Sequence, residues 1–308
     1  MKIGVVLVTY NRLEKIKVAL QKYEEQEYKP EYILVVDNCS TDGTNEFLNI
    51  WEKNTSSYRK EVITLPSNSG GAGGFYSGME RALNLEADWI WLSDDDAYPR
   101  KDALKNINDY YENLTSQEKK TIVAMCSTVY NNGEIHKEHR NHIILTKLKC
   151  IIQSSSLKEY EKKAFSIDMF SYVGAIIKKD TIKKVGLDIK DFFIYCDDQE
   201  HSIRIGREGK IMCITNSIID HDTLPYDKNV INWGRYYKKR NDLLMIKKNY
   251  PYRYFFFRFI RRYISDVSLF SKNPPELKIM LKDAYRDAWN NKTGLHDIYR
   301  PGWNIAKK

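Results

Sequence analysis

The chain of 308 residues is 42% hydrophobic and 29% charged, a composition that excludes disordered, collagen-like and coiled-coil proteins. The length suits one or two domains with a large core. The formal net charge is +8, but residues 235–263 hold ten Lys or Arg against the single acid Asp242, so this segment carries +9 and the rest −1. Five cysteines without a CxxC pair indicate reduced thiols. Apolar runs such as residues 3–8 are far shorter than the roughly 20 residues of a membrane span, and we expect a cytosolic protein.

Apolar runs and helical periodicity predict an α/β fold. Residues 3–8 predict a buried strand, a helical pattern follows through about Tyr23, and a second strand is expected at residues 32–36. This βαβ unit implies a mostly parallel sheet covered by helices on both faces. Further strands are predicted at residues 61–65, 89–92, 121–127, 172–177 and 211–219.

Residues 131–156 are predicted to form a variable loop region. The segment contains three histidines, His136, His139 and His142. A metal site of these histidines is the alternative, and we favour the loop.

Polar side chains follow several of the predicted strands. Ligands of open α/β sheets bind beyond the carboxyl ends of the strands, so residues 9–12 and 37–41 should flank one crevice. The glycine-rich segment 68–74 follows a strand and precedes a helical pattern that begins near Phe75. It predicts a loop that offers backbone amides to an anion, and a flexible turn is the alternative. The segment lacks the spacing of a Walker loop or a dinucleotide fingerprint.

Acidic residues occur in three clusters. Asp94, Asp95 and Asp96 directly follow an apolar strand, and a hard divalent cation would relieve their mutual repulsion. Alternation along an extended segment favours Asp94 and Asp96 as ligands, while a helix-capping turn is the alternative. In residues 197–200 one carboxylate is a candidate general base, in competition with helix capping, and Glu200 with Arg204 is expected to form a surface pair. His221 lies between two acids at a strand end and is a candidate metal ligand.

Residues 235–263 mix their basic side chains with ten aromatic residues. Membrane headgroups fit this combination, because rings bury into the interface while Lys and Arg attract anionic lipid. Nucleic acid fits it as well. A helical subdomain with an aromatic core and solvated basic residues is the structural alternative.

Taken in order, these motifs resemble the family 2 glycosyltransferases of the GT-A fold, and most of all bacterial galactofuranosyltransferases. The resemblance covers about residues 1–245 and depends on the motifs at residues 8–12, 36–44, 68–75, 94–96 and 196–200, on His221, and on the later pairs Tyr236-Tyr237 and Arg240-Asn241. Cys196 departs from the family, which often has Trp there, so the acceptor pocket is expected to differ. The chain also lacks the flanking domains of the polymerising enzymes, which favours a single sugar addition.

The resemblance implies roles for individual residues. It implies a donor-binding set of Thr9, Asn11, Arg12, Asp37, Asn68, Gly70, Gly71, Asp94 and Asp95. It implies that Asp94, Asp96 and His221 hold Mn²⁺ or Mg²⁺, with Asp198 as the catalytic base. We therefore expect a GT-A catalytic domain at residues 1–230 and a helical, membrane- or acceptor-facing extension at residues 231–308.

The predicted activity is inverting, metal-dependent transfer of a sugar in cell-surface polysaccharide synthesis, such as capsule or O-antigen. The donor would be UDP-galactofuranose, and the acceptor a hydroxyl of a lipid-linked glycan or oligosaccharide at the cytoplasmic leaflet. The alternatives are a rhamnosyltransferase that uses dTDP-rhamnose, a nucleotidyltransferase on a similar sheet, and a nucleic-acid-binding protein that uses the basic segment. We expect no nucleic-acid partner.

Overall fold

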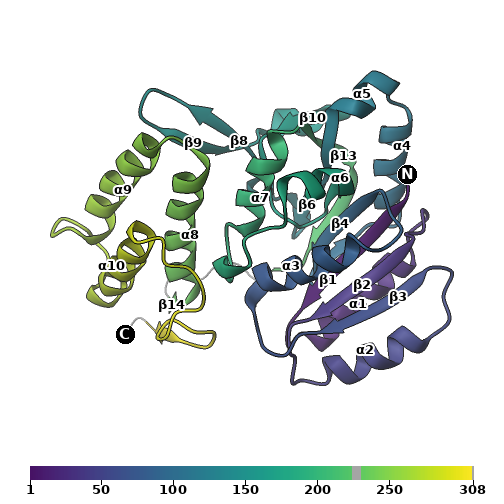
Figure 1. The fold of residues 1–308 in the computed structure, drawn as a ribbon, viewed down its shortest axis with the longest axis horizontal. Coiled ribbons are helices and arrows are strands. Elements are labelled where there is room, and N and C mark those ends of the chain that lie inside the picture. Colours follow the sequence, from purple (N-terminus) through teal and green to yellow (C-terminus); the bar gives the residue numbers. More distant parts are fainter. Residues whose placement is uncertain (224–229, 307–308) are drawn as a thin grey trace.

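A computed structural model describes residues 1–223 and 230–306. Its main element is a ten-stranded mixed sheet with helices on both faces (Figure 1). The strands of this sheet are β1 (Ile3–Thr9), β2 (Tyr32–Asp37), β3 (Arg59–Thr64), β4 (Trp89–Asp94), β5 (Ala97–Pro99), β6 (Ile122–Asn131), β7 (Glu134–Ile135), β10 (Ala164–Ile167), β12 (Ala175–Lys178) and β13 (Lys210–His221).

The helices are α1 (Leu13–Glu24), α2 (Thr44–Lys53), α3 (Gly70–Ala82), α4 (Ala103–Glu112), α5 (Ser116–Thr121), α6 (Lys179–Val185), α7 (Asp197–Gly206), α8 (Gly234–Asn249), α9 (Tyr252–Val267) and α10 (Pro275–Trp289). Short 3₁₀ turns are η1 (Lys137–His139), η2 (Leu157–Glu161) and η3 (Lys190–Phe192). Two small sheets contain β8 (Arg140–Leu145), β9 (Cys150–Ser154) and β11 (Met169–Phe170), and β14 (Val230–Asn232) and β15 (Asn304–Ala306).

The strand order is β10-β13-β6-β12-β4-β1-β2-β3, with β5 paired to β13 and β7 paired to β6. Strands β1 to β4 form a parallel set, and β6 is parallel to β13. The antiparallel strand β12 joins the two sets. The predicted mostly parallel sheet is therefore confirmed, and the N-terminal βαβ unit is present as expected.

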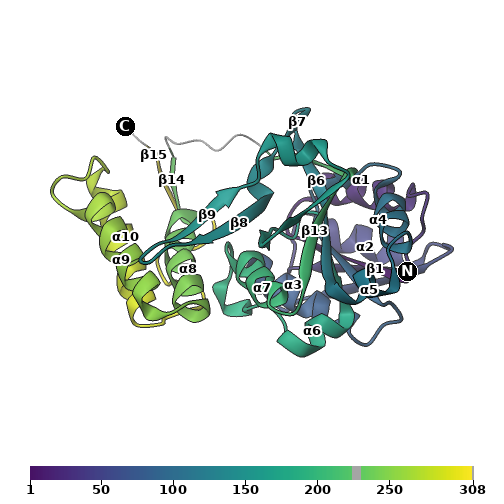
Figure 2. The same ribbon diagram turned by 90° about the horizontal axis from the view of Figure 1, so that it is seen from above.

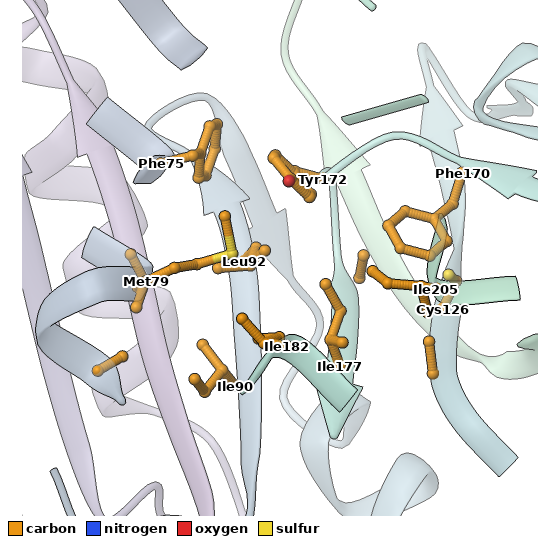
Figure 3. Packing of buried hydrophobic residues seen from close by; sticks show 14 of the residues in the cluster. Phe75, Met79, Ile90, Leu92, Cys126, Phe170, Tyr172, Ile177, Ile182 and Ile205 are labelled. Carbon is orange, nitrogen blue, oxygen red and sulfur yellow. The ribbon is translucent and has the colours of Figure 1, made fainter. Parts of the chain in front are cut away.

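Helices bury both faces of the sheet. Successive side chains of a strand point in opposite directions, so they enter different cores. Val6 and Val8 of β1 belong to the core beneath α3, α6 and α7, whereas Val5 and Leu7 face α1, α2 and α4. Figure 3 shows part of the first core, where Met79 lies near Ile90 and Leu92.

Helices α8, α9 and α10 pack on one another beside the main sheet, with a separate hydrophobic core between them (Figure 1). Several aromatic residues of the basic segment belong to that core, including Tyr236, Tyr237 and Phe255, which are fully buried. The structural alternative of an aromatic helical core thus holds for these residues, while other aromatic residues of the same segment remain exposed.

The prediction of a loop over residues 131–156 is wrong in part. Strands β8 and β9 form a hairpin there that reaches the C-terminal helices (Figure 2). The Arg258 guanidinium donates to the Cys150 carbonyl at 3.1 Å, and the Tyr254 hydroxyl donates to the Thr146 carbonyl at 3.0 Å. The hairpin depends on these distant contacts, which local sequence does not contain.

Candidate active site

The carboxyl ends of β1, β2 and β4 meet at one edge of the sheet, because these strands are parallel neighbours. The register sets Thr9 opposite Asp37 and Val8 opposite Asp94. A cavity of about 230 Å³ opens at this edge. It is lined by Val8, Thr9, Tyr10, Arg12, Asn38, Asn68, Gly70, Gly71, Asp94, Asp95, Phe193, Ile194, Trp233 and Pro301.

Most of the predicted donor-binding residues line this cavity, but Asn11 and Asp37 do not. Asp37 is fully buried and accepts hydrogen bonds from the Ser40 backbone N–H at 3.0 Å and from Asn45 Nδ2 at 3.3 Å. Asn11 accepts from the Thr41 backbone N–H at 2.7 Å. Both side chains therefore shape the loop after β2, and a nucleotide contact by either of them stays a prediction.

A larger cavity of about 670 Å³ lies at the opposite edge of the sheet. Met1, Lys2 and Trp89 line it, near the amino ends of β1 and β4. It contains none of the predicted site residues, so its size does not make it the better candidate.

Asp94, Asp96 and His221 form a group that fits a metal ion. One potential ligand atom from each residue lies within 4.8 Å of the others. His221 Nε2 is 3.2 Å from Asp96 Oδ1, and strand pairing explains this contact because His221 of β13 lies opposite Ala97 of β5. Two carboxylates and one imidazole suit Mn²⁺ or Mg²⁺, with further positions left for phosphate oxygens.

Asp95 is not a member of this group, and residues 95 and 96 form a turn, so the choice of Asp94 and Asp96 by alternation along an extended segment stays a prediction. The Asp95 carboxylate accepts from Thr9 Oγ1 at 2.8 Å and from Arg12 Nη1 at 3.0 Å. Arg12 Nη1 also donates to Asp96 at 2.8 Å, so one guanidinium bridges two of the three acids. Arg12 thereby balances part of the negative charge at this strand end.

The crowding of the acids changes their pKa values. Burial and the neighbouring Asp96 raise the pKa of Asp94 to about 7. Burial raises the pKa of Asp95 to about 6 against the opposing charge of Arg12. Burial acts in the same direction on Asp96, but the hydrogen bond and charge of His221 outweigh it and lower that pKa. A divalent cation would favour the ionised form of all three acids.

The glycine-rich segment is not a loop before a helix: it forms the first turns of α3. The Gly70 N–H donates to Asn68 Oδ1 at 2.8 Å, and the Ala72 N–H donates to the Phe193 carbonyl at 3.1 Å. These two amides are therefore engaged within the protein, which corrects the expectation that they are offered to an anion. Gly70 has φ +73°, and a Cβ there would lie 1.9 Å from the Phe193 carbonyl oxygen. A glycine at position 70 therefore allows the Phe193 segment to approach closely.

Asn38 is a functional residue that sequence reasoning missed. Its Nδ2 donates to the Gly70 carbonyl at 2.8 Å and to Asn68 Oδ1 at 3.2 Å, and its Oδ1 accepts from the Ser69 N–H at 2.9 Å. Asn38 thus fixes the start of α3 against the end of β2. Its position directly after Asp37, at a strand's carboxyl end, is the signal that was available.

The segment before the second acidic cluster has an unusual backbone. Phe193, Tyr195 and Cys196 all have positive φ, between 64° and 67°. Asn241 Nδ2 of α8 donates to the carbonyls of Phe192 at 2.9 Å, Ile194 at 2.9 Å and Tyr195 at 3.0 Å. Such strained conformations persist only where surrounding contacts hold them, and one buried asparagine supplies three such contacts here.

Asp197 and Asp198 begin α7 directly after this segment. Burial raises the pKa of Asp198 to about 6. Burial, the charge of Asp198 and the charge of Asp94 raise the pKa of Asp197 well above its usual range. The acids at residues 94–96 and 197–198 therefore interact electrostatically. A carboxyl whose pKa lies near neutrality is suited to accept a proton.

The expected surface pair of Glu200 and Arg204 exists but is largely buried. Glu200 is 2% exposed, and Arg204 Nη2 donates to it at 2.8 Å. Arg204 Nη1 also donates to the Val185 carbonyl at 2.7 Å, so the pair anchors α7 to the end of α6.

Trp233 and Pro301 also line the candidate cavity, although they lie outside the predicted catalytic domain. No local pattern marks them, because their position depends on the return of the chain from the C-terminal helices. The predicted boundary at residue 230 therefore divides residues that share one cavity.

The sheet, the acids at its carboxyl edge and the adjacent second acidic cluster define a GT-A nucleotide-sugar glycosyltransferase. The model of glycosyl transferase family 2 matches residues 4–186, more than half of the chain. The chain therefore belongs to that family and is a glycosyltransferase, as its motifs predict.

Curated relatives include galactofuranosyltransferase GlfT1 of Mycolicibacterium smegmatis, 27% identical over 216 residues that span 70% of this chain and 69% of that protein. The dTDP-rhamnosyl transferase RfbF of Shigella flexneri is 25% identical over 80% of each chain. Among solved structures, S. aureus TarS 1-349 in complex with UDP-GlcNAc has a TM-score of 0.59 and 16% identity, over 94% of this chain and 81% of that chain. A Pyrobaculum calidifontis mannosyltransferase in complex with GDP-Man and Mn²⁺ has a TM-score of 0.56 and 16% identity, over 94% and 75%. These structures support the GT-A fold.

Proposed function

We propose that the protein transfers galactofuranose from UDP-galactofuranose onto a hydroxyl of a lipid-linked or oligosaccharide acceptor, with inversion at the anomeric carbon. Transfer of rhamnose from dTDP-rhamnose, with release of dTDP, is the second candidate, because a relative that covers 80% of the chain is named a dTDP-rhamnosyl transferase. The observation that carries the proposal is the convergence of Asp94, Asp96 and His221 beside a cavity that Asp94 lines at the carboxyl edge of the sheet.

In this proposal Asp94, Asp96 and His221 would hold Mn²⁺ or Mg²⁺. The cation supplies positive charge for the leaving diphosphate when it is bound. Thr9 and Arg12 orient Asp95 at the cavity wall, and Asn38 fixes Asn68 and Gly70 on the other side. The donor would thus meet a wall whose side chains are already held by hydrogen bonds.

Asp198 would accept the proton of the acceptor hydroxyl. Its pKa of about 6 leaves it largely ionised at neutral pH and able to act as a base. A base and a leaving group on opposite sides of the anomeric carbon give inversion.

A further cavity of about 340 Å³ lies next to the start of α7 and is our candidate for the acceptor site. Cys196 and Gln199 line one side, and the basic residues Arg235, Lys238, Lys239 and Arg262 line the other, together with Asp242, Asp266, Leu277 and Leu281. Both acids are already paired, since Asp242 binds Arg258 and Lys239 lies 2.7 Å from Asp266. An acceptor with an anionic group fits this charge.

A donor panel tests the proposal. Incubation of the protein and Mn²⁺ with UDP- and dTDP-sugars, followed by mass spectrometry, should show hydrolysis of UDP-galactofuranose in preference to the others. Preferential hydrolysis of dTDP-rhamnose would favour the second candidate. Inertness toward every nucleotide sugar, with hydrolysis of nucleoside triphosphates instead, would contradict both.

We also infer that α9 contacts the cytoplasmic leaflet. No helix in residues 1–223 or 230–306 has both the length and the apolarity for a membrane span. Instead α9 exposes apolar side chains along one helical stripe, Tyr252, Phe256, Phe257, Ile260, Tyr263 and Ile264, and the turn after it exposes Leu269 and Phe270. The last two are 98% and 93% exposed. Arg253 and Arg261 are exposed on the same helix, which gives the two attractions that stable interfacial binding needs.

Vesicle flotation measures this contact. The double variant Arg253→Ala/Arg261→Ala removes two cations. Because each basic residue near an anionic surface contributes about 1 kcal/mol, binding to phosphatidylglycerol vesicles should weaken by roughly thirtyfold. Lys120→Ala/Lys183→Ala, which removes two exposed cations from the catalytic part, should not change flotation. Equal recovery of the unmodified protein on anionic and neutral vesicles would rule out the electrostatic attraction.

A further inference from the structure

The hairpin of β6 and β7 brings two histidines to the end of β13. Strand β7 pairs with β6, and β6 lies parallel to β13 with Tyr130 opposite Asp220. His136 follows β7, and His139 ends the 3₁₀ turn η1. A 3₁₀ helix has three residues per turn, so side chains at positions 136 and 139 share one side.

The nitrogens of these two histidines have a spacing that suits a metal. His136 Nδ1 and His139 Nε2 are 3.2 Å apart. A tetrahedral zinc ion at 2.0–2.1 Å from two nitrogens holds them about 3.3 Å apart. One nitrogen of each of His136, His139 and His221 lies within 4.8 Å of the others. Small ring rotations would aim all three at one ion.

The other ring nitrogens of the pair already have oxygen partners. His139 Nδ1 is 2.6 Å from Ser171 Oγ, and His136 Nε2 is 3.8 Å from a Glu138 carboxylate oxygen. Metal-binding histidines usually have such a partner on the second nitrogen, which fixes the ring and its tautomer. The inward nitrogens, His136 Nδ1 and His139 Nε2, hydrogen-bond to each other, and a metal ion between them would replace this bond.

His221 connects this group to the predicted catalytic metal site. Its Nε2 lies 3.2 Å from Asp96, as described above. Its Nδ1 is buried and has no hydrogen-bond partner among the described residues, 1–223 and 230–306. A buried polar atom without a partner is costly, and a metal on that side would satisfy it.

We propose that His136, His139 and His221 form a second cation site, selective for Zn²⁺ or a similar imidazole-preferring metal, which shares His221 with the carboxylate site. Imidazole nitrogens suit zinc, whereas Mg²⁺ prefers oxygen ligands, so the two sites differ in preference. The two cations would use opposite nitrogens of the His221 ring, so zinc on Nδ1 withdraws electron density from Nε2 and adds positive charge beside the Mn²⁺ or Mg²⁺ site, which weakens cation binding there and inhibits transfer. The regulatory part rests on the proposed function, and zinc binding itself does not.

Zinc binding is measured on the untagged chain by competition with a chromophoric chelator, and ligand geometry by the visible absorption of Co²⁺. The wild-type chain should bind zinc at one site and give the intense bands of tetrahedral Co²⁺. His136→Ala/His139→Ala should weaken zinc affinity by at least about a hundredfold, since loss of an outer-shell partner alone costs 10–100-fold. His142→Ala is the matched control, because this histidine lies in the same segment but binds Glu159 at 2.9 Å.

His136→Gln removes a partly exposed ligand and serves if the double variant fails to fold. It should lower zinc affinity and abolish zinc inhibition of Mn²⁺-dependent donor hydrolysis, with hydrolysis in the absence of zinc unchanged within twofold. Zinc affinity equal in wild type, His136→Gln and His142→Ala would overturn the site. Zinc binding without inhibition would overturn only its regulatory role, and lack of donor hydrolysis would contradict the proposed function while leaving the binding result intact.

Discussion

Replacing Asp198 by Asn is expected to lower turnover by roughly 10²-fold or more, with UDP affinity within twofold of wild type. The amide keeps the size of the side chain but cannot accept the acceptor's proton. Because burial raises the pKa of Asp198 to about 6, wild-type kcat should rise with pH through about 6 as the carboxylate forms and fall below it as the carboxyl is protonated. The variant's residual rate should lack this pH dependence. Steady-state kinetics over a pH series measures both effects.

Two other variants complete this experiment. Asp191→Asn removes an exposed carboxylate six residues before the start of α7 and should behave as wild type. Asp197→Asn tests the neighbouring acid, whose pKa is raised further by burial. Loss of turnover in Asp197→Asn with normal turnover in Asp198→Asn would transfer the base role to Asp197.

Asp96→Ala is expected to weaken Mn²⁺-dependent UDP binding by at least tenfold, an effect of the order found when even an outer-shell partner of a metal is lost. The substitution removes one of the three candidate ligands and the partner of His221 Nε2. Calorimetry with UDP, with and without Mn²⁺, separates metal-dependent from metal-free UDP binding. Metal-free UDP binding should change little, because Asp95 keeps its contacts with Thr9 and Arg12.

Asp220→Asn provides the control for this variant. Asp220 is adjacent to His221 and pairs with Arg100 at 3.0 Å. Its replacement by Asn removes one negative charge from the same strand end but leaves all three candidate ligands in place. Equal Mn²⁺ dependence in wild type and Asp96→Ala would exclude Asp96 as a ligand.

Much of the fold was predictable because its determinants are local. The apolar runs at β1, β2 and β4 are continuous and fully buried, so their position in a covered parallel sheet follows from sequence. The assignment of Asp94 and Asp96 as ligands stays a prediction, because residues 95 and 96 form a turn and Arg12 binds both Asp95 and Asp96.

The missed features depend on contacts between distant segments. The β8–β9 hairpin is supported by α9, and the amides of the glycine-rich segment are engaged by Asn68 and Phe193. Trp233 and Pro301 enter the cavity only because the chain returns there. The sequence shows His136, His139 and His142 in one segment, whereas the structure brings His221 close to His136 and His139. Except for the contact of Asn68 with Gly70, each partner lies dozens of residues away, where periodicity carries no information.

The three hydrogen bonds of Asn241 make the turn before α7 dependent on helix α8. A chain ending at residue 232 would retain the candidate metal ligands and both Asp197 and Asp198, but it would lose the side chain that clamps the strained turn before them. The same truncation would remove Trp233 and Pro301 from the wall of the candidate cavity, so the C-terminal helices complete both that cavity and the turn before α7.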